Sequence, residues 1–131
     1  MTRLFATVGA LFGLGAVILG AFGAHALEGR ITPERAEVWS TATQYLGWQG
    51  TALLAVAALS WSTNTPAAAQ RLFGIAGWLL VIGTLIFSGS LFVLVLSKIS
   101  AFGAITPVGG LLLVTGWGVT AAATLKLKSP G

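Results

Sequence analysis

Apolar residues occupy four long stretches of the chain, and short polar segments separate them. The stretches cover about residues 4–24, 42–61, 72–96 and 105–125. Each is long enough to cross the hydrocarbon core of a bilayer as an α-helix, which takes about 20 residues. A segment in lipid must satisfy its backbone hydrogen bonds internally, and a helix does so. The pattern therefore predicts an all-α fold, an integral membrane four-helix bundle with short loops.

A Thr-Pro pair lies before or at the start of three of these stretches and predicts where helices begin. The pairs are Thr32-Pro33, Thr65-Pro66 and Thr106-Pro107. Threonine can cap the free N–H groups of a first turn, and proline fits the first helical position because it has no N–H to lose. The first pair lies well ahead of its apolar stretch, so residues 33–41 should form a helical start at the membrane surface. No segment resembles a soluble domain, and residues 1–131 are predicted to be one four-span transmembrane domain.

The N-terminal stretch has a second interpretation. A basic start, an apolar run and the sequence Ala24-His25-Ala26 also fit a cleaved signal peptide. The apolar run is long for a signal peptide, and its glycines are typical of helix packing. We therefore expect this stretch to be a retained span.

Composition supports a membrane environment and limits the kinds of partner that the protein can bind. Charged residues make up only 8% of the chain and hydrophobic residues 56%, whereas a soluble domain carries roughly 25% charged residues. The net charge of +4 comes from basic residues scattered at helix ends. This scatter favours membrane lipids as partners, through their headgroups, and argues against nucleic acid. The absence of cysteine excludes disulfides, thiol catalysis and thiolate metal sites.

Basic residues also bear on the orientation in the membrane. Four spans put both termini on one side, which then holds four basic residues: Arg3, Arg71, Lys126 and Lys128. The opposite side holds three: Arg30, Arg35 and Lys98. Because the more basic side faces the cytoplasm, the count favours cytoplasmic termini by one residue.

Small residues spaced by three or four follow one face of the first stretch. They are Gly9, Gly13, Ala16, Gly20 and Gly23. In lipid, small residues allow helix backbones to approach closely, which is the main device of helix association. We expect this face to be a helix-packing interface, either within the chain or, alternatively, against another subunit.

Charged residues are absent from the apolar stretches, which hold no Asp, Glu, Lys or Arg. Charged groups inside spans are typical of transporters and membrane enzymes. His25 is the single histidine, so the chain alone cannot ligate haem with two histidines, and a haem shared with a partner is the remaining alternative. No nucleophile triad, carboxylate pair or phosphate loop is visible. We predict no catalytic residues, no metal, no cofactor and no enzymatic activity.

Polar residues and glycines gather where the first stretch joins the second and the third joins the fourth. The set is His25, Tyr45, Gln49, Thr106, Gly109 and Gly110. We predict that they converge into a polar binding pocket, where the helix start at Thr106 would offer free N–H groups to an anion or a lipid headgroup. The alternative is that His25 and Tyr45 only tie the first loop to the bundle by hydrogen bonds.

Several motifs resemble a known family. The segment GAFGAHAL at 20–27, SGSLF at 88–92, ITPVGG at 105–110 and Tyr45 are similar to motifs of the YgdD-like family of small bacterial inner-membrane proteins, which are grouped under a domain of unknown function. The resemblance implies four spans and an address in the bacterial inner (cytoplasmic) membrane, and it implies no established activity. Gln49 stands where that family usually has a histidine, so the resemblance does not support a site built on two histidines.

Together these features predict a function without catalysis. We expect an accessory, structural or assembly subunit of a larger membrane protein complex. The alternative is a small transporter, or a protein that binds a lipid or another small molecule, using the polar end near His25, Tyr45 and Thr106.

Overall fold

The computed structural model describes residues 1–62 and 64–127. Its elements are α1 (Thr2–His25), α2 (Pro33–Ser60), α3 (Ala67–Ser97), the 3₁₀ helix η1 (Ser100–Ala104) and α4 (Thr106–Thr124). The described part of the chain contains no strand, which confirms the all-α prediction. Lys128, counted above with the basic residues of the terminal side, lies outside the described residues.

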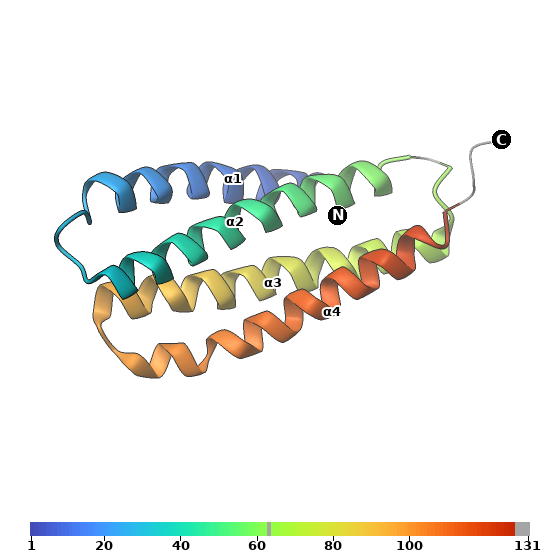
Figure 1. Ribbon diagram of the computed structural model, residues 1–131. Helices are drawn as coiled ribbons and strands as arrows, with labels where there is room; N and C mark the ends of the chain where they lie inside the picture. Colours follow the sequence, from blue (N-terminus) through green and yellow to red (C-terminus); the bar gives the residue numbers. More distant parts are fainter. Residues whose placement is uncertain (63, 128–131) are drawn as a thin grey trace.

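The four α-helices lie side by side in chain order and alternate in direction (Figure 1). α1 packs on α2, α2 on α3 and α3 on α4. Within the residues that the structure describes, the outer members α1 and α4 do not form a packed pair. The start of α1 and the end of α4 lie at one end of the molecule with the connection between α2 and α3, and the other two connections lie at the opposite end (Figure 1). We call these the terminal end and the loop end.

Within the described residues, three segments are long and apolar enough to cross a membrane: Thr2–His25, Ala67–Ser97 and Ser100–Thr124. They support a membrane protein with several spans. α2 has 28 residues, which is also a sufficient length, but it is more polar than the others and is not among the three. Four of its polar side chains are Ser40, Gln44, Gln49 and Thr51.

The Thr-Pro pairs mark helix starts, but only the first acts as a cap. The Thr32 hydroxyl accepts the Arg35 N–H at 3.4 Å, and α2 begins at Pro33. The cap prediction is wrong at Thr65, because its hydroxyl turns back and donates to the Leu59 carbonyl, while Pro66 takes the cap position of α3. It is also wrong at Thr106, whose hydroxyl bonds across to α3.

Glycines allow close approach in both outer helix pairs. A Cβ added at Gly9 of α1 would lie 2.7 Å from the Gly50 carbonyl oxygen of α2. A Cβ at Gly116 of α4 would lie 3.0 Å from the Leu80 side chain of α3. At Gly9 the two backbones are in direct contact, and at Gly116 a side chain of α3 packs against the helix backbone of α4. The predicted glycine-rich packing is therefore found between neighbouring helices of this chain.

Candidate functional site

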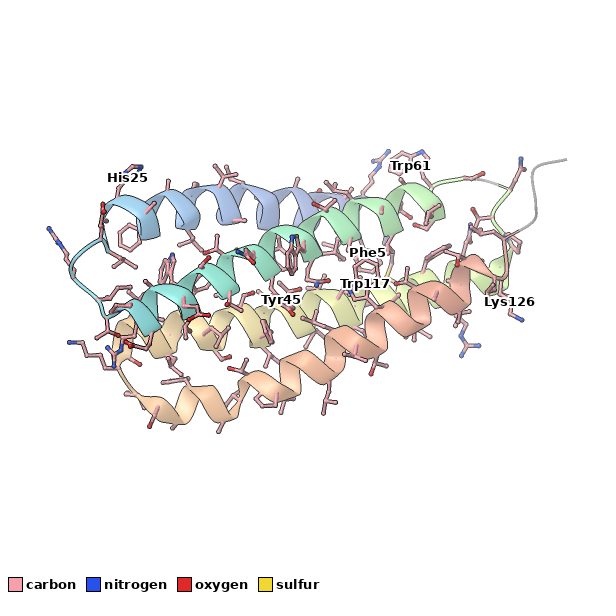
Figure 2. The ribbon with its side chains drawn as sticks, in the orientation of Figure 1. Phe5, His25, Tyr45, Trp61, Trp117 and Lys126 are labelled. Carbon is pink, nitrogen blue, oxygen red and sulfur yellow. The ribbon has the colours of Figure 1, made fainter. Side chains whose placement is uncertain are left out.

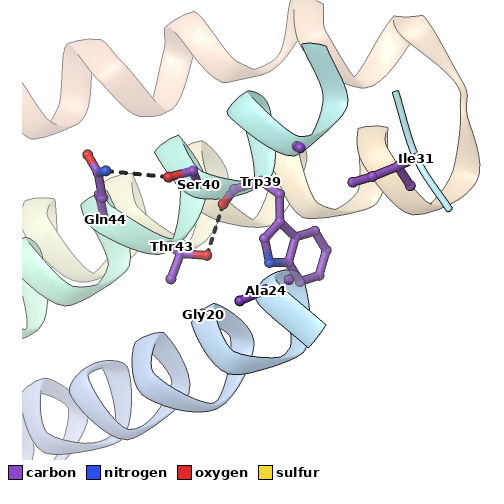
Figure 3. Close-up of a pocket in the computed structure, with 9 residues that line it drawn as sticks. Gly20, Ala24, Ile31, Trp39, Ser40, Thr43 and Gln44 are labelled. Atoms are coloured by element: carbon purple, nitrogen blue, oxygen red, sulfur yellow. Dashed lines mark hydrogen bonds between the residues drawn. The ribbon is translucent and has the colours of Figure 1, made fainter. Parts of the chain in front are cut away.

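A groove of about 330 Å³ lies between the last turns of α1 and the first half of α2, and it extends from near the loop end toward the middle of α2 (Figure 3). Ligand sites commonly measure about 300–1,000 Å³, so the groove can hold part of a small molecule. Nine residues line it: Gly20, Gly23, Ala24, Ile31, Ala36, Trp39, Ser40, Thr43 and Gln44.

Small residues of α1 form one wall and create the space. Gly20, Gly23 and Ala24 present little or no side chain toward α2. A Cβ added at Gly20 would already lie 3.4 Å from the Thr43 methyl group. The GAFGA sequence at the end of α1 therefore leaves the helix backbone as the surface of the groove.

The indole of Trp39 lines the groove and is fixed on several sides. Its Nε1 donates a hydrogen bond of 2.8 Å to the Leu19 carbonyl of α1. Its ring lies 4.7 Å from that of Phe92 on α3 and 5.7 Å from that of Phe22 on α1. The missing side chain of Gly23 makes room for it, since a Cβ there would lie 2.5 Å from the indole. Trp39 thus joins three helices and gives the groove a rigid aromatic surface.

Uncharged polar side chains of α2 form the opposite wall (Figure 3). Thr43 Oγ1 donates to the Trp39 carbonyl at 2.9 Å, and Gln44 Nε2 donates to Ser40 Oγ at 3.4 Å. Ser40 and Gln44 are exposed. The Gln44 amide keeps its carbonyl oxygen and one N–H for another molecule, and the Ser40 hydroxyl keeps its proton. Of the nine described lining residues none is ionisable.

A second hollow, of about 470 Å³, continues the groove toward the first loop. The two share Gly23, Ala24, Ile31 and Ala36. The hollow adds residues of the loop, among them Glu28, which is exposed. The joined space therefore runs from the loop surface down between α1 and α2.

His25 and Tyr45, predicted to share a pocket, lie far apart. His25 is exposed at the end of α1 and points away from the helices (Figure 2). Tyr45 lies twelve residues after Pro33 in α2, which is about 18 Å along the helix axis. Its ring packs on Phe87 of α3 at 4.5 Å and on Trp48 at 5.2 Å. Because α2 begins so early, Tyr45 lies near mid-helix rather than at the loop end.

Gln49 and Thr106 instead make contacts between helices. Gln49, only 4% exposed, accepts a hydrogen bond of 3.1 Å from Nε1 of Trp117 on α4. Thr106 Oγ1 and Ser90 Oγ of α3 lie 2.7 Å apart. The polar groups of both residues are thus used within the chain.

Gly109 and Gly110 pack against Phe87 of α3. Tyr45 packs on the same phenylalanine, so Phe87 contacts both Tyr45 and the two glycines. The structure therefore distributes the six predicted pocket residues over several helix contacts and does not gather them into one site.

The small-residue face of α1 lies mainly against α2. Gly9 meets Gly50, Ala16 meets Gly47, and Gly20 and Gly23 line the groove. Gly13 differs, because a Cβ added there would meet no described atom within 4 Å.

Sequence reasoning missed Trp39, Ser40, Thr43 and Gln44. A signal was available in their spacing, since these residues recur at three to four positions along the start of α2. The short connection between α1 and α2 sets them opposite the GAFGA segment. Among the described residues, no cluster of three His, Cys, Asp or Glu side chains could hold a metal ion.

Comparison with known proteins places the chain in a family. The family model described as "Protein of unknown function (DUF423)" matches residues 19–110, a range that includes the whole groove. No solved structure gives a significant match.

Relatives of similar length carry the same designation, UPF0382 membrane protein. One from Staphylococcus aureus is 43% identical over 95% of this chain and 97% of its own length. One from Staphylococcus epidermidis is 42% identical over 95% of this chain and 97% of its own length. YwdK from Bacillus subtilis is 41% identical over 95% of this chain and 98% of its own length. These matches confirm the expected class of small bacterial membrane proteins, while the YgdD-like designation stays a resemblance. The chain belongs to the DUF423 family of proteins of unknown function and is related along nearly its whole length to the UPF0382 membrane proteins.

Proposed function

We propose that this protein is a four-span membrane protein of the bacterial cytoplasmic membrane, without catalysis, that binds an uncharged lipid-like molecule in the groove between α1 and α2. The observation that supports the proposal is the groove itself. It combines a small-residue wall, an aromatic surface and an uncharged hydrogen-bonding wall. A ligand with a polar head and an apolar chain matches this combination.

The connectivity supports α2 as the fourth span. α1 ends at the loop end and α3 begins at the terminal end (Figure 1). If α1 and α3 both cross the membrane, the chain between them must cross it too. α2 also follows α1 along its length, from the Thr2–Ser60 hydroxyl contact to the Gly23–Trp39 contact. Its polarity has local causes: the groove wall, and Gln49, which is paired inside the protein.

The depth of the groove fits an amphipathic ligand. Gly20 lies five residues before His25, the last residue of α1, which corresponds to about 8 Å of helix. The groove therefore extends from the interface region into the hydrocarbon region. A polar head can lie near Ser40 and Gln44 while an apolar chain follows the bilayer.

The lining argues for an uncharged ligand. A charge held at the edge of the hydrocarbon core is costly unless an opposite charge compensates it. The described lining offers only hydroxyl and carboxamide groups. These groups can pair with the hydroxyl or ester groups of a neutral lipid.

An accessory role in a larger complex has less support than ligand binding. That expectation needed a free small-residue face on α1. Four of its five residues, Gly9, Ala16, Gly20 and Gly23, contact α2. We therefore favour the binding alternative, now located at the groove rather than near Tyr45 and Thr106.

Photolabelling with a diazirine-bearing diacylglycerol tests the proposal. The full chain is reconstituted in phosphatidylcholine nanodiscs, and labelled peptides are identified by mass spectrometry. We expect labelling between residues 20 and 44. Ala24→Phe fills the groove and should remove most of that labelling. Ala21→Phe is the matched control, because Ala21 is exposed on the same helix but does not line the groove.

Two further variants test whether the polar side chains of the groove contribute to binding, apart from the volume that the groove offers. Gln44→Leu should weaken labelling, whereas Thr51→Val, an exposed change on the same helix outside the groove, should not. Equal labelling in Ala24→Phe and Ala21→Phe would overturn the proposal.

A further inference from the structure

A different cavity, at the terminal end, has the opposite chemistry. It measures about 340 Å³ and lies where α1 begins, α2 ends and α3 begins. Its polar lining residues are Thr2, Ser60, Gln70 and Arg71. An adjoining hollow of about 370 Å³ shares Thr2 and adds Arg3 and Trp61. This end of the molecule therefore presents two guanidinium groups, one in each of two adjoining hollows.

Positive charge is unopposed by acidic side chains here. The three acidic residues of the chain, Glu28, Glu34 and Glu37, all lie in or just after the first loop, at the loop end (Figure 1). Arg3, Arg71 and Lys126 lie at the terminal end, where Figure 2 marks Lys126. An arginine without a neighbouring carboxylate keeps its planar set of donors for an external anion.

Backbone donors add to this charge. Both α1 and α3 begin at the cavity, and in the described structure neither start has a side-chain cap or an acidic residue in its first turn. The first N–H groups of a helix have no partner within the helix, and the helix dipole makes this end positive. The Ser60 hydroxyl, in contrast, already donates to the Ala57 carbonyl.

The depth of the cavity suggests where the anion comes from. Arg71 is the fifth residue of α3, and residues 72–96 after it carry no charge. The cavity thus lies at the boundary between the hydrocarbon core and the headgroups. Trp61, 60% exposed beside it, is a residue type enriched at this boundary.

We propose that this cavity binds the phosphate of an anionic phospholipid headgroup, with Arg71 as its main ligand and Arg3 as a second cation. Arg71 pairs with phosphate oxygens through its guanidinium fork, and Gln70 supplies an uncharged donor. The glycerol and acyl chains of the lipid extend along the bilayer surface of α1 and α3. This site is separate from the neutral groove and does not depend on it.

Native mass spectrometry of the full chain in mild detergent tests the site. Phosphatidylglycerol, phosphatidylcholine and inorganic phosphate are titrated separately. We expect phosphatidylglycerol to bind more tightly than phosphatidylcholine. Arg71→Gln should reduce that preference about tenfold, as expected for the loss of a charge-assisted hydrogen bond. Lys126→Gln removes the same charge at the same end outside the cavity, and should change the preference by less than about twofold.

Further measurements distinguish a lipid headgroup from free phosphate and show whether the variants are folded. Arg71→Lys should restore part of the preference, and a circular dichroism spectrum equal to that of the unmodified chain shows that the variants are folded. Inorganic phosphate bound as tightly as phosphatidylglycerol would overturn the lipid assignment. Equal losses in Arg71→Gln and Lys126→Gln would overturn the site, since they indicate only general charge attraction. Ala24→Phe should leave the preference for phosphatidylglycerol unchanged, so the proposals for the groove and for the cavity can be refuted independently.

Discussion

At the scale of single residues, the absence of a side chain at a few glycines decides how α1 and α2 meet. Gly9 and Gly50 face each other so closely that a Cβ on either would lie within 2.8 Å of the other's carbonyl oxygen. A backbone atom in a helix cannot move aside as the tip of a flexible side chain can. Gly9 is therefore a position where even one methyl group forces the helices apart.

Gly9→Ala should destabilise the protein by about 1–3 kcal/mol, the usual cost of overpacking. The measurement is reversible unfolding in mixed detergent micelles, followed by circular dichroism. Gly13→Ala is the matched control, because its Cβ would meet no described atom within 4 Å. It should leave the stability unchanged or raise it by at most about 1 kcal/mol through helix propensity. Equal losses in both variants would contradict the packing described for α1 and α2.

The spacing of small residues predicted the packing face of α1, but it could not separate Gly13 from its neighbours. A face defined by steps of three and four is broad, and only the position of the partner helix decides which members touch it. Trp39 shows the same limit. Its role depends on the Leu19 carbonyl and the gap at Gly23, and neither is visible until the two helices are aligned.

At the scale of elements, α2 differs from the other helices because it carries polar groups with specific partners. The Gln49 carboxamide oxygen and the Trp117 indole N–H form a bond between α2 and α4, across helices that are not neighbours in the chain. Gln49 is only 4% exposed, so its carboxamide has little access to solvent. The bond therefore helps to hold α4, in the second half of the chain, against α2, in the first half.

A double-mutant cycle of Gln49→Leu and Trp117→Phe should give a coupling energy of about 0.6 kcal/mol, the mean for hydrogen bonds between membrane helices. The same unfolding assay measures it. Thr51→Val combined with Trp117→Phe serves as the comparison, because Thr51 donates to the Gly47 carbonyl of its own helix. Coupling of the same size in both cycles would rule out the proposed bond.

Helix existence and approximate bounds were predictable because apolar length controls them in a membrane protein. The details at the ends were not, because each Thr-Pro pair lies beside different acceptors. Thr32 faces the free N–H of Arg35, whereas Thr65 reaches the Leu59 carbonyl and Thr106 reaches Ser90. The residues of the predicted pocket lie apart because their positions also depend on the neighbouring helices. Gln49 faces Trp117 of α4, whereas His25 lies at the end of α1.

At the scale of the whole molecule, the two ends carry different chemistry. The loop end holds all acidic side chains and a groove without charge in its lining. The terminal end holds a cavity with Arg71 and an adjoining hollow with Arg3. Both proposed sites depend on one arrangement, in which all four helices cross the membrane and the ends face opposite sides. The more basic terminal end should then face the cytoplasm.

Cysteine accessibility tests this arrangement most directly, and the natural chain has no cysteine to interfere. Single cysteines are introduced by Arg30→Cys, Asn64→Cys and Lys98→Cys, at positions that are all exposed in connections between helices. Each is treated in intact cells with a maleimide that does not cross the membrane. Four spans with cytoplasmic termini predict labelling at positions 30 and 98 and protection at 64 until the cells are opened. Labelling of positions 30 and 64 from the same side would show that α2 does not cross the membrane, and would contradict the account.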